Sequence, residues 1–143
     1  MTISDYPQTV VEVLDNEMTF EPEVLEAVQA FKRSKPWRGN LEQRKEKFMH
    51  LNHDLAAVCG IPEPELVFGT IDGSHSGDSS YSPAHHRITL RGRLSVVTML
   101  HEWGHARGMG ERAACRWSIN LFRRCFPRQY AKLVHKGHML VRP

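Results

Sequence analysis

The chain has 143 residues, of which 41% are hydrophobic and 24% are charged, and its formal net charge is +3 at pH 7. This composition is typical of an ordinary globular protein and excludes disordered and fibrous proteins. We expect one domain over residues 1–143, because a chain of this length can bury most of its apolar surface around a single core.

Two helices are predicted in the N-terminal part of the chain. Apolar residues recur at helical spacing over residues 22–34. Asn40 and Gln43 have the spacing of a capping box, so a second helix should begin there. It should run to Cys59 and end at Gly60 in a left-handed backbone conformation. The apolar stripe expected on this second helix consists of Leu41, Phe48, Leu51, Leu55 and Val58.

Short strands are predicted next, at residues 66–68 and 86–90, on either side of a stretch rich in glycine and serine at 72–80. We expect two or three antiparallel strands. Ser95 can cap a helix over residues 96–108, and a last helix should begin at Glu111 and end near residue 127.

These elements predict the α+β class, with helices packed on a short antiparallel sheet. The N-terminal part, about residues 1–60, is helical. The part from about 61 to 143 holds the strands, the last two helices and the motif described next.

Residues 101–105 read His-Glu-Trp-Gly-His inside a predicted helix. Histidines four positions apart project from one face of a helix, so His101 and His105 can bind one metal ion. Glu102 lies one step around the helix, where its carboxylate can take a proton from a metal-activated water without being a ligand. Gly104 permits close approach of another element. The pattern predicts a zinc site; the alternative is a pair of surface histidines on an ordinary helix.

Glu111 is the candidate for a third ligand. Zinc peptidase sites use three protein ligands and leave the fourth position for water or substrate. Glu111 heads the inward stripe of the last predicted helix, and an inward carboxylate is costly unless a cation pairs with it. The other members of that stripe are Ala114, Cys115, Ser118, Leu121, Phe122 and Cys125. The alternative role of Glu111 is to stabilise the positive N-terminal end of its own helix.

Four histidines are rivals for the third position. His85 and His86 are adjacent on a predicted strand and face opposite sides, so at most one of them can point at the metal. His135 and His138 could share the face of a helix, but Gly137 between them argues against a helix there.

The segment from about residue 79 to 127 resembles the ImmA/IrrE-type zinc metallopeptidases of the gluzincin group. In that family a short strand leads into a helix bearing His-Glu-x-Gly-His, and the next helix opens with Glu-x-x-Ala, whose glutamate is the third ligand. The corresponding residues here are 86–90, 101–105 and 111–114. The resemblance implies a zincin-like active-site helix, bound Zn²⁺ and hydrolysis of peptide bonds.

One departure from this family pattern is the connection of only five residues between His105 and Glu111. Read as His-Glu-x-x-His-x-x-Gly-x-x-Glu, with Gly108 in place, the segment also resembles the metzincin signature, with Glu111 where a third histidine is usual. Met139 is then a candidate for the methionine turn of that group. Both resemblances indicate the same ligands.

We therefore expect a zinc-dependent metallopeptidase in which Glu102 is the general base and later the proton donor. A peptide or protein substrate would lie extended beside an exposed strand edge, for which residues 81–90 are the candidate. Tyr81 could polarise the substrate carbonyl, or it could be a core or surface tyrosine. An alternative is a hydrolase that acts on an electrophile other than a peptide.

The C-terminal region carries a second hypothesis. Residues 111–143 hold eight lysines and arginines against Glu111 alone, whereas residues 1–65 hold seven against twelve acidic residues. The eight are Arg112, Arg116, Arg123, Arg124, Arg128, Lys132, Lys136 and Arg142. A metal-stabilised, non-catalytic module could bind nucleic acid or an acidic partner through them. They lack the interleaved aromatic residues of a base-stacking surface, which favours a solvated helix face instead.

Localisation is predicted from what the sequence lacks. No stretch approaches the roughly 20 apolar residues needed to cross a bilayer, and the N-terminus does not resemble a signal peptide. The cysteines are odd in number and lack the paired spacing of a metal site, which favours reduced thiols that act as small buried hydrophobes. We expect a cytoplasmic protein without a membrane partner.

Overall fold

The computed structural model describes residues 10–69, 79–136 and 139–143. In chain order its elements are α1 (Val10–Val13), α2 (Pro22–Arg33), α3 (Leu41–Cys59), β1 (Glu65–Gly69), β2 (Ser80–Ser82), β3 (Arg87–Arg91), α4 (Val96–Ala106), α5 (Glu111–Cys125), α6 (Pro127–Ala131), β4 (Val134–Lys136) and β5 (Met139–Val141). The α+β class is confirmed.

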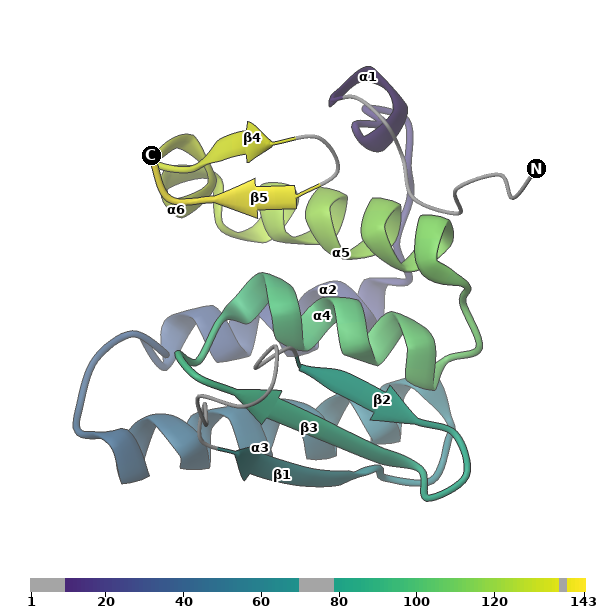
Figure 1. Cartoon of the computed structure of the whole chain (residues 1–143), viewed down its shortest axis with the longest axis vertical. Helices are drawn as coiled ribbons and strands as arrows, with labels where there is room; N and C mark the ends of the chain where they lie inside the picture. The colour runs from purple at the N-terminus through teal and green to yellow at the C-terminus, as the bar shows by residue number, and fades with distance from the viewer. Residues whose placement is uncertain (1–9, 70–78, 137–138) are drawn as a thin grey trace, which may run out of the picture.

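The helices and the sheet form layers around α4. Figure 1 shows α4 between the three-stranded sheet and α5, with α2 and α3 behind them. The hairpin of β4 and β5 lies beyond α5. The helix that carries the His-Glu-Trp-Gly-His motif is therefore covered by the sheet on one side and by α5 on another.

The sheet has the order β1-β3-β2, and one of its two strand pairs differs from the prediction. The pair β2–β3 is antiparallel, as expected for strands joined by a short turn. The pair β1–β3 is parallel, so the expectation of an antiparallel sheet is wrong for β1. The reason is topological: β2, the next described strand, lies at the far edge of the sheet and pairs antiparallel with β3, so β3 runs in the same direction as β1.

Local signals in the sequence set the ends of the long helices. The capping box of α3 is confirmed, because Asn40 Oδ1 accepts from the Gln43 backbone and Gln43 Oε1 accepts from the Asn40 backbone, both at 2.9 Å. Gly60 ends α3 with φ of 67°. The predicted stripe of α3 is wrong at its two ends, since Leu41 and Val58 lie in the terminal turns and are 56% and 39% exposed.

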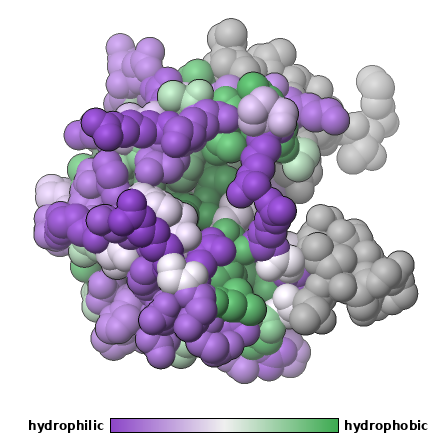
Figure 2. All heavy atoms as spheres, turned by 90° about the vertical axis from the view of Figure 1, so that its left-hand side faces the viewer, coloured by the Kyte–Doolittle hydropathy of each residue, from purple (hydrophilic) through white to green (hydrophobic). Residues whose placement is uncertain are grey.

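The core lies between the helices and the sheet. Its largest fully buried side chains are Trp103, Phe48, Phe126, Leu51, Leu55, Ile88, Met99, Leu100 and Leu121. The stripe predicted for α5 is buried from Ala114 to Cys125, whereas Glu111 at its head is partly exposed. In Figure 2, hydrophilic side chains cover most of the face nearest the viewer and surround a hollow in which hydrophobic side chains are visible.

Three features were not predicted: the short helices α1 and α6, and the hairpin of β4 and β5. All three cysteines are free thiols, and Cys115 and Cys125 are buried. Within the described part of the chain, no helix combines the length and the apolar character of a membrane span.

Candidate metal centre

The turn between α4 and α5 sets the position of the candidate site. Gly108 has φ of 93°, a left-handed conformation that favours glycine. Its backbone N–H donates to His105 O at 2.9 Å, and the N–H of Met109 donates to Gly104 O at 3.0 Å. This pair of bonds is a Schellman motif, which closes the end of α4 and reverses the chain. Glu111 therefore begins α5 beside the last turn of α4.

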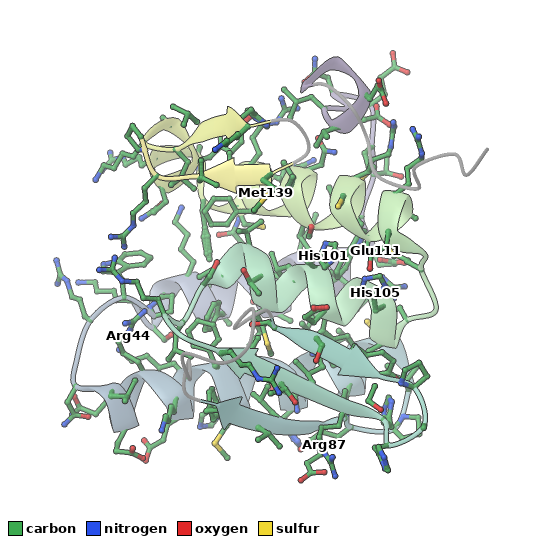
Figure 3. The ribbon with its side chains drawn as sticks, viewed as in Figure 1. Arg44, Arg87, His101, His105, Glu111 and Met139 are labelled. Carbon is green, nitrogen blue, oxygen red and sulfur yellow. The ribbon has the colours of Figure 1, made fainter. Side chains whose placement is uncertain are left out.

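His101, His105 and Glu111 converge between the two helices, as Figure 3 shows. The Nε2 atoms of the two histidines are 3.2 Å apart. Glu111 Oε2 lies 3.3 Å from Nε2 of His101, and Glu111 Oε1 lies 2.8 Å from Nε2 of His105. The structure thus brings together the three residues named as ligands from the sequence.

Two of these distances, 3.2 Å and 3.3 Å, are close to those of a single zinc site, and the third, 2.8 Å, is shorter. In a tetrahedral zinc site with bonds of about 2.0–2.1 Å, neighbouring ligand atoms are about 3.3–3.4 Å apart. A shared cation would satisfy both nitrogens and the carboxylate at once.

His105 is held in the tautomer that metal binding requires. Its Nδ1 lies 2.9 Å from the carbonyl oxygen of Met109. A carbonyl only accepts, so Nδ1 must carry the proton and a neutral ring presents the lone pair of Nε2. Such outer hydrogen bonds fix ring orientation in metal sites.

Glu102 is the buried acid of the site, with 4% exposure. It lines a cleft of about 520 Å³ together with His105, Glu111 and the strand residues Ser80 and Tyr81. A carboxylate in a cleft beside three potential ligands is suited to exchange a proton with a water molecule there.

Cys115 is a site residue that the sequence interpretation treated only as a buried hydrophobe. Its Sγ lies 3.7 Å from Nδ1 of His101. Besides the set with His105 and Glu111, two other groups of described residues bring potential ligand atoms together: His101 with Glu102 and His105, and His101 with Glu111 and Cys115. The available signal was spacing, because Cys115 follows Glu111 by four positions and so shares its helix face.

A buried polar network supports α4 from the other side. Asn52 of α3 is 2% exposed, and its Oδ1 accepts from Nε1 of Trp103 at 3.0 Å. Its Nδ2 donates to the carbonyl of Pro64, just before β1, at 2.9 Å. The side chain of Asn52 therefore ties the motif helix to both α3 and the sheet, a role that sequence spacing did not indicate.

The rival histidines have other surroundings. His86 contacts Tyr81 through Nδ1 at 2.7 Å and the Pro62 carbonyl through Nε2 at 2.6 Å. His85 is exposed in the turn between β2 and β3. Nε2 of His135 is hydrogen-bonded to the hydroxyl of Tyr130. His138 and most of the stretch 72–80 lie outside the described residues.

Met139 does not occupy the position of a methionine turn. It pairs with Lys136 in the terminal hairpin and is 52% exposed. Figure 3 shows it on the other side of α5 from the labelled site residues. The metzincin comparison therefore fails at this residue, because the chain after α5 folds away from α4.

The N-terminal segment engages part of the basic C-terminal region. Three of the eight cations contact residues 12–16. Arg112 lies 3.4 Å from Glu12, and Arg116 lies 3.2 Å from Asp15. Arg123 donates a hydrogen bond to Asn16. The five other cations are exposed. The acidic excess of the N-terminal half thus offsets part of the positive charge on α5.

Comparisons with known proteins add no relatives: no protein-family model, no curated protein and no solved structure matches this chain.

Proposed function

We propose that this chain is a zinc-dependent metallopeptidase in which His101, His105 and Glu111 hold the ion. The observation that carries the proposal is the convergence of two Nε2 atoms and one carboxylate at 2.8–3.3 Å beside a cleft that also contains Glu102. Membership of the ImmA/IrrE-type family, which the motif order resembles, is part of the same proposal.

Each residue has a defined task. A bound zinc ion lowers the pKa of its water and polarises a carbonyl oxygen. The Glu102 carboxylate accepts the proton of the attacking water and then delivers it to the nitrogen of the leaving amine. The hydrogen bond from His105 Nδ1 to Met109 keeps that imidazole oriented during both transfers.

The substrate is proposed to be an extended peptide. In the described sheet β2 is an edge strand, and Ser80 and Tyr81 line the same cleft as Glu102. An edge strand offers backbone donors and acceptors, so a peptide can add to it as a further strand. This arrangement would place a peptide bond next to Glu102 without demanding a particular side chain.

The test combines a metal assay with a digest. Purified chain loaded with zinc should bind one ion and cleave an unstructured protein such as casein. Glu102→Gln should retain the ion and lose activity on the order of 100-fold to 10,000-fold, the usual contribution of a general base. His101→Ala should lose both. Glu46→Gln, which changes an exposed glutamate of α3, is the matched control and should behave as the unmodified chain.

Two results would contradict the proposal separately. Metal content that is unchanged in His101→Ala would refute the metal site. Cleavage by Glu102→Gln at the unmodified rate would refute the peptidase mechanism while leaving the metal site intact. Activity on small esters without cleavage of any peptide would favour the alternative of a non-peptide hydrolase.

The non-catalytic alternative has less support, because residues 12–16 already engage three of the eight cations that it requires. It predicts binding to a nucleic acid that weakens steeply as salt rises and does not depend on Glu102. A cytoplasmic location belongs to the main proposal, supported by three free thiols.

A further inference from the structure

Both histidines of the candidate centre have an outer partner at Nδ1, and the two partners differ. The partner of His105 is the backbone carbonyl of Met109 at 2.9 Å. The partner of His101 is the thiol of Cys115, with Sγ 3.7 Å from Nδ1. Cys115 is 3% exposed, so bulk water competes little for this contact.

We propose that Cys115 is a positioning residue, whose sulfur accepts a hydrogen bond from Nδ1–H of His101 and so directs Nε2 of that ring at the metal. This inference rests on the proposed metal site, but not on peptide hydrolysis. Outer-shell partners of ligating histidines fix the tautomer and the ring orientation. Sulfur is a weak acceptor, so its contribution depends on the fixed geometry of the surrounding helices.

The position of Cys115 follows from α5. Glu111 and Cys115 are four residues apart, so they lie on the same face of the helix, one turn from each other. Glu111 meets the Nε2 side of His101 at 3.3 Å while Cys115 meets the Nδ1 side. One face of α5 therefore contacts both nitrogens of the same imidazole and leaves the ring little freedom to rotate.

A direct Cys115–metal bond is the competing arrangement, because His101, Glu111 and Cys115 also form a group that can hold an ion. Two observations favour the outer role. In the set of His101, His105 and Glu111 the potential ligand atoms lie 2.8–3.3 Å apart. His105 and Glu111 of this set line the cleft, where the open position of a catalytic ion must lie. Cys115 is buried and does not line that cleft.

Zinc affinity measured by competition with a chromogenic chelator tests the inference without reference to catalysis. Cys115→Ala removes the acceptor and should weaken zinc binding by about 10-fold to 100-fold, the range seen when outer-shell partners are removed. Cys115→Ser restores an acceptor of similar size and should recover most of the loss. Cys125→Ala is the matched control: it truncates another fully buried cysteine of α5 and should leave zinc affinity unchanged.

Two further measurements separate the outer role from simple packing. Nitrogen NMR of the imidazoles should show Nδ1–H on His101 in the zinc-loaded chain. In the zinc-free chain the same tautomer should persist with Cys115 and become mixed in Cys115→Ala. The visible spectrum of the cobalt-loaded chain should lack a thiolate charge-transfer band.

Each contrary outcome is distinct. Native zinc affinity in Cys115→Ala would overturn the positioning role. A thiolate band that disappears in Cys115→Ser would show that Cys115 is a ligand and also overturn it. If His101→Ala binds zinc as tightly as the unmodified chain, the metal site itself fails. If Glu102→Gln cleaves at the unmodified rate while the zinc measurements agree with the expectations above, the peptidase mechanism fails and the role of Cys115 stands.

Discussion

Gly104 of α4 lies directly against Ala114 of α5. A Cβ atom added at Gly104 would fall 3.0 Å from Cβ of Ala114 and 3.1 Å from its Cα. Carbon atoms in ordinary contact are about 3.5–4.0 Å apart, so no residue larger than glycine fits here unless the helices move. This close approach lets the carboxylate of Glu111 reach both histidines across the helix pair.

Gly104→Ala should therefore weaken zinc binding by separating α4 from α5. Overpacking costs about 1–3 kcal/mol, while alanine regains about 1 kcal/mol of helix propensity. We expect a net loss of at most about 2 kcal/mol in the unfolding free energy. The loss in zinc affinity should be about 10-fold, in the range of outer-shell changes. Urea unfolding of the metal-free chain and chelator competition measure the two effects.

The double variant Gly104→Ala with Ala114→Gly provides the control, because it returns the added methyl's space on the opposite helix. Zinc affinity should recover in the double variant even though a glycine now weakens α5. If Gly104→Ala binds zinc as the unmodified chain does, close helix approach is not what positions Glu111.

The buried network around Asn52 should matter more for stability than an exposed asparagine does. Asn52→Leu leaves the indole N–H of Trp103 and the Pro64 carbonyl without their partner. At about 1–3 kcal/mol for each of these two unsatisfied buried groups, we expect a loss of about 2–6 kcal/mol in urea unfolding. Asn40→Ala, which removes only a helix cap, should cost about 1 kcal/mol. Equal losses in the two variants would refute this role for Asn52.

Tyr81 is not expected to polarise a substrate carbonyl. The Pro62 carbonyl only accepts, so Nε2 of His86 donates to it, Nδ1 accepts, and the Tyr81 hydroxyl donates to Nδ1. The hydroxyl proton of Tyr81 is therefore already engaged in a hydrogen bond with His86. Tyr81→Phe should lower stability by about 1 kcal/mol and reduce catalytic efficiency by less than about 10-fold, whereas loss of an oxyanion donor costs about 100-fold to 1,000-fold.

Tyr130→Phe is the comparison for Tyr81→Phe, because Tyr130 makes the same kind of bond to His135 away from the cleft. The two variants should lose similar stability. If catalytic efficiency in Tyr81→Phe alone falls by about 100-fold or more, Tyr81 does polarise the carbonyl as an oxyanion donor.

His135 should make the fold less stable in mild acid. Burial lowers the pKa of His135, and the nearby Arg123 lowers it further. As pH falls, His135 of the unfolded chain therefore binds a proton first, at about pH 6.5. His135 of the folded chain binds a proton only at a lower pH. The contribution of His135 is fully present above about pH 6.5 and is lost as pH falls from there towards the lower native pKa.

Urea midpoints between pH 5 and 7.5, measured with chelator present, test this dependence. His135→Gln should flatten the fall in stability below pH 6.5, whereas His50→Gln, at an exposed position of α3, should leave it as in the unmodified chain. Identical pH curves for the unmodified chain and His135→Gln would contradict the assignment.

Local chemistry explains what could be predicted. The caps at Asn40 and Ser95 and the stops at Gly60 and Gly108 act over a few residues, so they are readable in the sequence. The spacing of the two histidines is equally local. The burial of α5 followed from its apolar period, which is why an inward Glu111 could be named before its neighbours were known.

Contacts between distant segments explain what could not be predicted. The basic residues of α5 resembled an open surface, yet Asp15 reaches Arg116 across about a hundred positions. Asn52 and Trp103, about fifty positions apart, share a buried hydrogen bond that neither local pattern indicates. The parallel pairing of β1 with β3 depends on the placement of β2 at the far edge of the sheet, not on strand composition.

The sequence by itself determined the helix that carries His101 and His105, because a helix face is a property of spacing alone. Only the tertiary structure decided that Glu111 lies 2.8–3.3 Å from both imidazoles and that Cys115 faces the other nitrogen of His101. Those distances depend on how closely α5 can approach α4, and the packing of Gly104 against Ala114 sets that approach.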